Sequence, residues 1–136
     1  MARIVFGVFM VLHGQVHILY AAHSQRLLEL QPDMRWPDGS WALSATIGTK
    51  ATRVFATVGC SIGAIGFVIS GAALLAGQPW WQSAAVISAA VSTATVVLCW
   101  DGRLRDLDNQ GLIAVILNVV IVVLPVLLRW PPSRRP

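Results

Sequence analysis

The chain has 136 residues, of which 56% are hydrophobic and only 12% are charged, and its formal net charge is +4. Soluble domains carry about 25% charged residues, so this composition excludes an ordinary soluble domain and predicts an integral membrane protein in a lipid bilayer. The basic residues lie in the connections and the tail, where such residues set topology and contact lipid headgroups. We therefore expect no nucleic-acid partner.

Four apolar segments have about the length of a membrane-crossing helix, which is about 20 residues. They predict helices over about 4–23, 52–76, 80–100 and 110–128 of a single domain, 1–136. Short connections join antiparallel neighbours. The predicted fold class is therefore all-α, an integral membrane four-helix bundle with up-down-up-down topology.

This topology places both termini on one side of the membrane. The ten Lys and Arg residues divide into four on that side and six on the other, which by number favours termini outside the cell. The terminal basic residues, however, have no acidic neighbours. For that reason we expect cytoplasmic termini in a bacterial inner membrane.

The first segment holds the most informative residues of the chain. His13 and His17 lie one helical turn apart, and His13 falls near the middle of the segment. Ionisable side chains at that depth are costly and usually face a cavity or a partner. Tyr20 continues the same helical face toward the long connection 24–50, which we expect at the surface with a short amphipathic piece around 40–47.

The second segment is rich in small residues. Gly59 and Gly63 form a small-xxx-small pair, as do Gly66 and Ser70. Such pairs let helices approach closely, because helix association in lipid relies on packing. We expect this packing inside the bundle, and a face for a homo-oligomer is the alternative.

The third segment carries a mildly polar stripe of Ser88, Ser92, Thr95 and Cys99 at helical spacing. These side chains are expected to hydrogen-bond across helices or to their own backbone. Cys60 lies on another segment at a different expected depth from Cys99. The spacing of the two cysteines predicts neither a redox pair nor a metal knuckle.

Polar side chains from all four segments can be placed on facing stripes. His13 and Asn118 fall at a similar depth, where they would form the floor of a polar funnel that opens toward the charged loops. The residues expected to line this ligand-binding funnel are His13, His17, Tyr20, Arg53, Ser92, Thr95, Asp101 and Asn118.

The preferred function for such a funnel is binding of a small quinone- or lipid-like amphiphile, whose carbonyl would meet the imidazoles and the carboxamide. A second hypothesis is a membrane enzyme that uses His13 and His17 for proton transfer or metal binding. No Glu lies between the two histidines and no third ligand is evident, so we expect no metal site. A third hypothesis is a structural subunit of a membrane assembly, in which the histidines only bond across helices.

The first segment opens with a basic residue, a glycine and a polar residue followed by glycine, and the second segment is glycine-rich. These residues are Arg3, Gly7, His13, Gly14, Gly63, Gly66 and the stretch 72–77. The pattern resembles DoxX-like proteins, which are small four-helix bacterial membrane proteins, over the first two helices and the general layout. The resemblance implies a quinone as ligand or cofactor and an accessory role in a larger membrane redox complex.

Overall fold

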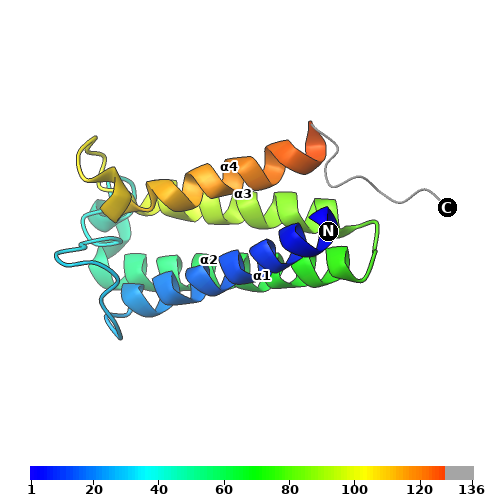
Figure 1. The fold of residues 1–136 in the computed structure, drawn as a ribbon. Helices are drawn as coiled ribbons and strands as arrows, with labels where there is room; N and C mark the ends of the chain where they lie inside the picture. Colours follow the sequence, from blue (N-terminus) through cyan, green and yellow to red (C-terminus); the bar gives the residue numbers. More distant parts are fainter. Residues whose placement is uncertain (128–136) are drawn as a thin grey trace.

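The computed structural model describes residues 1–127, and all secondary structure in this range is helical. Its elements in chain order are α1 (Ala2–Ser24), α2 (Ser44–Leu75), α3 (Trp81–Cys99), the 3₁₀-helix η1 (Leu107–Gln110) and α4 (Leu112–Val126). The four α-helices lie along one long axis, and the N-terminus lies at the same end as the connection between α2 and α3 (Figure 1). Helix α1 packs on α2, α2 on α3, and α3 on α4. The chain is thus a helical bundle, as its composition predicts.

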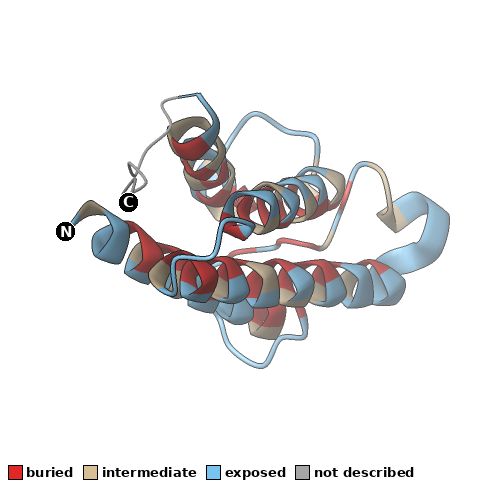
Figure 2. Cartoon of the chain, turned by 90° about the vertical axis from the view of Figure 1, so that its right-hand side faces the viewer, coloured by how far each residue is buried: buried red, intermediate tan, exposed pale blue. Residues whose placement is uncertain are grey.

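Each helix has one buried face and one exposed face (Figure 2). Aliphatic residues such as Leu12 and Ile65 are 59% and 60% exposed, whereas the polar residues His13 and Asn118 are only 3% and 1% exposed. Exposed aliphatic side chains around buried polar ones are typical of helices surrounded by lipid. Helices α1, α2 and α3, with 23, 32 and 19 residues, are each long and apolar enough to cross a membrane.

Helix α4 is apolar but shorter, with 15 residues from Leu112 to Val126. The predicted start at 110 is two positions early, because Gly111 adopts a left-handed conformation (φ 88°) that ends η1 and separates it from α4. Glycine tolerates this conformation because it has no Cβ atom. The predicted end at 128 and the basic tail lie outside the described residues.

Helix α2 begins at Ser44, earlier than the predicted start at about Thr52. The difference arises because an apolar run marks only the part of a helix that lies in lipid. The polar residues before Thr52 extend the helix beyond that part, with a kink at Gly48 (φ 81°, ψ 164°). Ser40 anchors this extension, since its hydroxyl accepts a hydrogen bond from the backbone N–H of Leu43 (2.9 Å) and donates one to the carbonyl of Leu98 in α3 (2.5 Å).

Glycines bring the backbones of α1 and α2 into close contact. A Cβ atom added to Gly71 would lie 2.7 Å from the carbonyl oxygen of Gly7, and one added to Gly14 would lie 2.9 Å from the carbonyl oxygen of Ala64. Both distances are shorter than side chains tolerate. The two helices therefore meet backbone to backbone, as small residues allow in membranes.

The glycines of α2 also receive the polar stripe of α3. Cβ atoms added to Gly59 and Gly66 would overlap the side chains of Thr95 and Ser88, and the same atom on Gly63 would lie 3.4 Å from Cβ of Ser92. The small residues thus pack inside the bundle, where they leave room for hydroxyl side chains.

The two cysteines are both buried free thiols. We expected them at different depths, but Cys60 and Cys99 belong to one buried cluster that also contains Ala21, Met34 and Trp36. They come together because Gly59 of α2 meets Thr95 of α3, so Cys60 beside Gly59 and Cys99 one turn beyond Thr95 lie near each other.

Candidate functional site

Two histidines, a serine, a threonine and an asparagine form a hydrogen-bonded group in the middle of the bundle. We call it the histidine cluster: His13 and His17 of α1, Ser92 and Thr93 of α3, and Asn118 of α4. It joins three helices, and α2 makes room for it because its Gly63 lies beside His17 and Ser92.

Four distances define the connections of the cluster. Nε2 of His13 lies 2.9 Å from Oδ1 of Asn118, and Nδ2 of Asn118 lies 2.9 Å from Oγ of Ser92 and 3.1 Å from Oγ1 of Thr93. Nε2 of His17 lies 2.5 Å from Oγ of Ser92. The amide of Asn118 therefore links α4 to both neighbouring helices.

The direction of each bond follows from one fixed partner. Nδ1 of His17 lies 2.9 Å from the carbonyl oxygen of His13, which can only accept, so this nitrogen carries the proton. In a neutral ring Nε2 of His17 then accepts from the hydroxyl of Ser92, and Ser92 accepts from the amide of Asn118. The oxygen of Asn118 accepts from Nε2–H of His13. One proton arrangement thus accounts for all of these hydrogen bonds with both imidazoles neutral.

This arrangement leaves one ring nitrogen of His13 without a hydrogen bond. Its Nε2 carries the proton, so its Nδ1 is an acceptor, and that atom is buried without a hydrogen-bond partner among the described residues. Buried polar atoms are nearly always paired, and an unpaired one calls for a ligand, a water molecule or strain. The acceptor at Nδ1 of His13 is the chemical feature that marks this cluster as a candidate site.

Two phenylalanines form the walls around the imidazole of His13. Phe67 of α2 meets it edge-on with ring centroids 4.7 Å apart, and Phe9 stacks on it at 5.9 Å with an interplanar angle of 13°. Phe67 is fully buried, whereas Phe9 is only partly buried. Phe9 therefore stands between one face of His13 and the surroundings of the bundle. Neither phenylalanine was singled out from the sequence, because an aromatic residue in an apolar helix carries no distinguishing pattern.

The other predicted lining residues lie elsewhere. Thr95 donates to the carbonyl of Val91 on its own helix (2.8 Å). This bond to the helix backbone is one of the two kinds expected for the polar stripe of the third segment. Tyr20 packs edge-on against Trp36, with ring centroids 5.4 Å apart. The structure therefore gathers His13, His17, Ser92 and Asn118 in the cluster, while Thr95 and Tyr20 bond and pack outside it.

Arg53 and Asp101, expected at the rim of the funnel, lie among the loops. Arg53 binds both carboxylate oxygens of Asp38, at 2.8 and 2.6 Å, and Arg26 binds the same carboxylate at 2.7 Å. Asp101 accepts from the backbone N–H of Arg103 (2.9 Å). The hydrogen bonds and the proximity of arginine lower the pKa of Asp38, chiefly through Arg53.

The ion pairs of Asp38 predict a pH-dependent contribution to stability. A carboxylate with a lowered pKa in the folded state stabilises the fold above its ordinary pKa of 3.8, and this stabilisation is lost as the pH falls through the lowered value. We expect Asp38→Asn to destabilise the protein by about 0.5–1 kcal/mol at neutral pH, because the pair is partly exposed. Thermal unfolding in detergent from pH 7 to pH 3 measures the effect, and the difference from wild type should shrink only below about pH 4. A difference that persists unchanged at the acid end would show that packing, not charge, is responsible.

The donor set of the histidine cluster suits hydrogen bonding to a neutral molecule. Among residues 1–127 no group of three or more His, Cys, Asp or Glu side chains lies close enough to hold a metal ion.

Comparisons with family models, with curated proteins and with solved structures give no match for this chain.

Proposed function

We propose that this protein is a multi-pass protein of the bacterial inner membrane that binds a small amphiphile at the histidine cluster. In this proposal its helices cross the bilayer in up-down-up-down order and its termini are cytoplasmic. The observation that carries the proposal is the buried, unpaired acceptor at Nδ1 of His13. A ligand that donates a hydrogen bond there removes the penalty of about 1–3 kcal/mol that an unsatisfied buried polar atom costs.

The proton arrangement of the cluster selects the class of ligand. Because Nδ1 of His13 accepts, its partner must donate, and a hydroxyl group is the donor that a neutral amphiphile offers. A quinol has such a hydroxyl, whereas the oxidised quinone presents only carbonyl oxygens. We therefore favour a quinol-like or hydroxylated lipid-like molecule, in place of the carbonyl ligand expected from sequence. The resemblance to DoxX-like proteins is a reason to place the quinol first.

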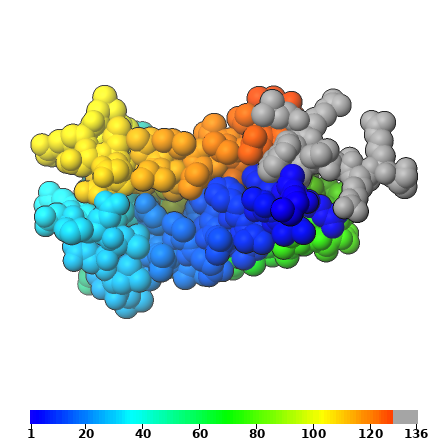
Figure 3. Space-filling view, viewed as in Figure 1, coloured from blue at the N-terminus to red at the C-terminus, as the bar shows by residue number. Residues whose placement is uncertain are grey.

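The side of the bundle between α1 and α4 is the approach to His13 that we propose for the ligand. Helices α1 and α4 lie next to each other on one face, where the blue and orange bands meet in Figure 3. Phe9 is partly buried and stacks on His13. We propose that the ligand enters between α1 and α4 and that Phe9 turns aside to admit it, while the aliphatic exterior holds the ligand's tail.

Exchanging His13 for glutamine separates ligand binding from packing. The terminal amide of glutamine can still donate to Asn118, but it provides no acceptor at the position of Nδ1. We expect purified H13Q to keep its fold and to bind a short-chain benzoquinol about tenfold more weakly than wild type, which is the effect of one lost hydrogen bond. Quenching of tryptophan fluorescence under argon measures the binding, with the oxidised quinone as second probe and His23→Gln, outside the cluster, as matched control.

Two results would contradict the proposal. One is equal affinity of wild type and H13Q for the quinol, and the other is tighter binding of the quinone than of the quinol by wild type. The first result would favour a structural subunit of a membrane assembly, as an oligomer or within a larger complex, for which the cluster only joins helices. The second result would instead favour a ligand that presents a carbonyl oxygen. The near-complete satisfaction of the cluster's hydrogen bonds supports the structural subunit as second candidate.

The enzyme hypothesis is supported by the short contact of 2.5 Å between Ser92 and His17. A hydroxyl that donates to an imidazole is the arrangement of a serine nucleophile and its base. Ser92 is only 1% exposed, however, and its oxygen already accepts from Asn118. A substrate would have to displace that amide, so we place the enzyme behind both binding and structural roles.

A further inference from the structure

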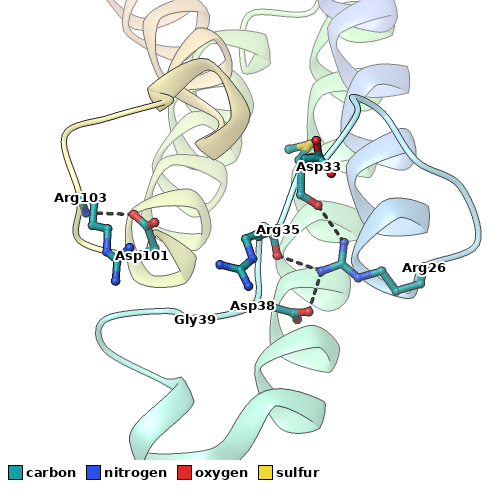
Figure 4. A pocket seen from close by; sticks show the side chains of 8 residues that line it. Arg26, Asp33, Arg35, Asp38, Gly39, Asp101 and Arg103 are labelled. Atoms are coloured by element: carbon teal, nitrogen blue, oxygen red, sulfur yellow. Dashed lines mark hydrogen bonds and ion pairs between the residues drawn. The ribbon is translucent and has the colours of Figure 1, made fainter.

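A cleft of about 720 Å³ opens at the end of the bundle where the 25–43 and 100–106 connections meet (Figure 4). Its lining holds three basic and three acidic residues: Arg26, Arg35, Arg103, Asp33, Asp38 and Asp101. None of these residues belongs to the histidine cluster. The cleft is therefore a second place at which a ligand could bind.

Two of the six charged residues are committed to the fold. Asp38 is held by Arg53 and by Arg26. Arg26 also donates to the carbonyls of Met34 (3.2 Å) and Arg35 (2.8 Å), so it fixes the course of the connection that contains them. These contacts neutralise Asp38 and leave Arg26 little freedom to meet a ligand.

The remaining two arginines are exposed and have no side-chain partner in the range 1–127. Within residues 1–127 no hydrogen bond or ion pair engages the guanidinium group of Arg35 or of Arg103. Figure 4 shows Arg103 on one side of the cleft with Asp101, and Arg35 on the opposite side near Asp38. The cleft thus presents two unpaired guanidinium groups from separate connections across a common space.

Acidic groups accompany these arginines. Asp101 accepts only the backbone N–H of Arg103, and the carboxylate of Asp33 has no hydrogen bond or ion pair in the described part of the chain. A purely anionic ligand would meet these carboxylates, and a purely cationic one would meet the arginines. A ligand with both charges close together satisfies both sets.

We propose that the cleft binds an aminoalkyl phosphate, with its phosphate between Arg35 and Arg103 and its ammonium group on Asp101. Guanidinium groups recognise phosphate through paired N–H donors, and a carboxylate accepts an N–H donor of a primary ammonium. A quaternary ammonium has no N–H to donate, so the site discriminates against choline.

Two tryptophans place the cleft at the level of the lipid headgroups. Trp41 is 58% exposed and donates to the carbonyl of Val97 (2.8 Å), and Trp100 donates to the carbonyl of Arg103 (3.0 Å). Tryptophan prefers the interface between membrane and water. The aminoalkyl phosphate can therefore come from the headgroup of phosphatidylethanolamine or from soluble phosphoethanolamine.

Native mass spectrometry of the full chain in detergent tests the proposal. Phosphatidylethanolamine, phosphatidylcholine and phosphatidylglycerol with identical acyl chains are offered in competition, and soluble phosphoethanolamine and inorganic phosphate are offered separately. The variants are R35Q, R103Q, the double variant and D101N. Arg105→Gln is the matched control, because Arg105 is exposed in the same connection as Arg103 but does not line the cleft.

We expect wild type to retain phosphatidylethanolamine about fivefold over phosphatidylcholine, and the double variant to lose this preference while R105Q keeps it. D101N should shift the preference toward phosphatidylglycerol, because it removes the partner of the ammonium group. Competition by soluble phosphoethanolamine at similar concentration identifies a soluble source, and its failure to compete identifies the lipid.

Equal retention of the three lipids by wild type together with no binding of phosphoethanolamine overturns the proposal, and so does a preference that survives in the double variant. The wild-type competition needs no variant, so a folding defect cannot conceal the answer. Because no cluster residue takes part, the outcome is independent of quinol binding at His13.

Discussion

Replacing Asn118 with leucine should lower the free energy of unfolding by about 1–3 kcal/mol. The substitution replaces the carboxamide with an apolar side chain of similar size, so it leaves the Nε2–H of His13 without its acceptor and removes the donor to Ser92 and Thr93. Interhelical hydrogen bonds in membranes average about 0.6 kcal/mol, so three lost bonds alone would account for the middle of this range. Loss of helical circular dichroism during titration with SDS in mixed micelles measures the change.

Val119 supplies the control for this experiment. It is the next residue of α4 and is 53% exposed, so Val119→Leu tests the tolerance of the helix for an added methylene facing outward. We expect a change below about 0.5 kcal/mol there. Equal stability of N118L and V119L would show that the cluster contributes nothing to the association of α4.

The largest steric effect is expected at Gly71. The obstacle to a side chain here is the backbone of α1, since the carbonyl of Gly7 would lie 2.7 Å from the new Cβ atom and the backbone nitrogen of Val11 would lie at 3.2 Å. A backbone cannot rotate away as a flexible side chain can. Gly71→Leu should therefore cost about 3 kcal/mol, at the upper end of the usual range for overpacking, because α1 and α2 must separate.

Ala72 is the matched position for this substitution. It follows Gly71 in α2 and faces outward. Ala72→Leu adds a similar volume to the exposed face, so it should leave the midpoint of SDS unfolding almost unchanged. A loss of stability shared by both variants would point to a general effect of bulk in this helix, and would contradict the close approach of α1 and α2.

The intramembrane part of the site could be anticipated from sequence because helices in lipid obey a simple geometry. A fixed rise and rotation per residue place His13 and Asn118 at similar depths, and a polar side chain at that depth has few possible partners. The loops obey no such rule. Nothing in the spacing of Asp38 and Arg53 shows that the connection folds back to pair them, and the polar extension of α2 carries no hydropathy signal.

The proton positions could not be predicted either. They depend on the contact between Nδ1 of His17 and the backbone carbonyl of His13, which is a detail of rotamers. That contact decides which atom of the other imidazole is left as an acceptor, and with it the class of ligand. The rotation of Thr95 and Tyr20 away from the cluster likewise depends on side-chain packing against Gly59 and Trp36.

The unequal packing of the four helices has a consequence for the way the chain assembles. Glycines hold α1 to α2 and α2 to α3 over much of their length, whereas α4 packs mainly on α3 and reaches α1 through the amide of Asn118. Helices α1 to α3 precede α4 in the chain and can therefore close on one another as soon as they leave the ribosome and enter the lipid. Until α4 arrives, the polar atoms of His13 and Ser92 lack their amide partner. We therefore expect docking of α4 to complete the interior, with the contacts forming in the order of synthesis.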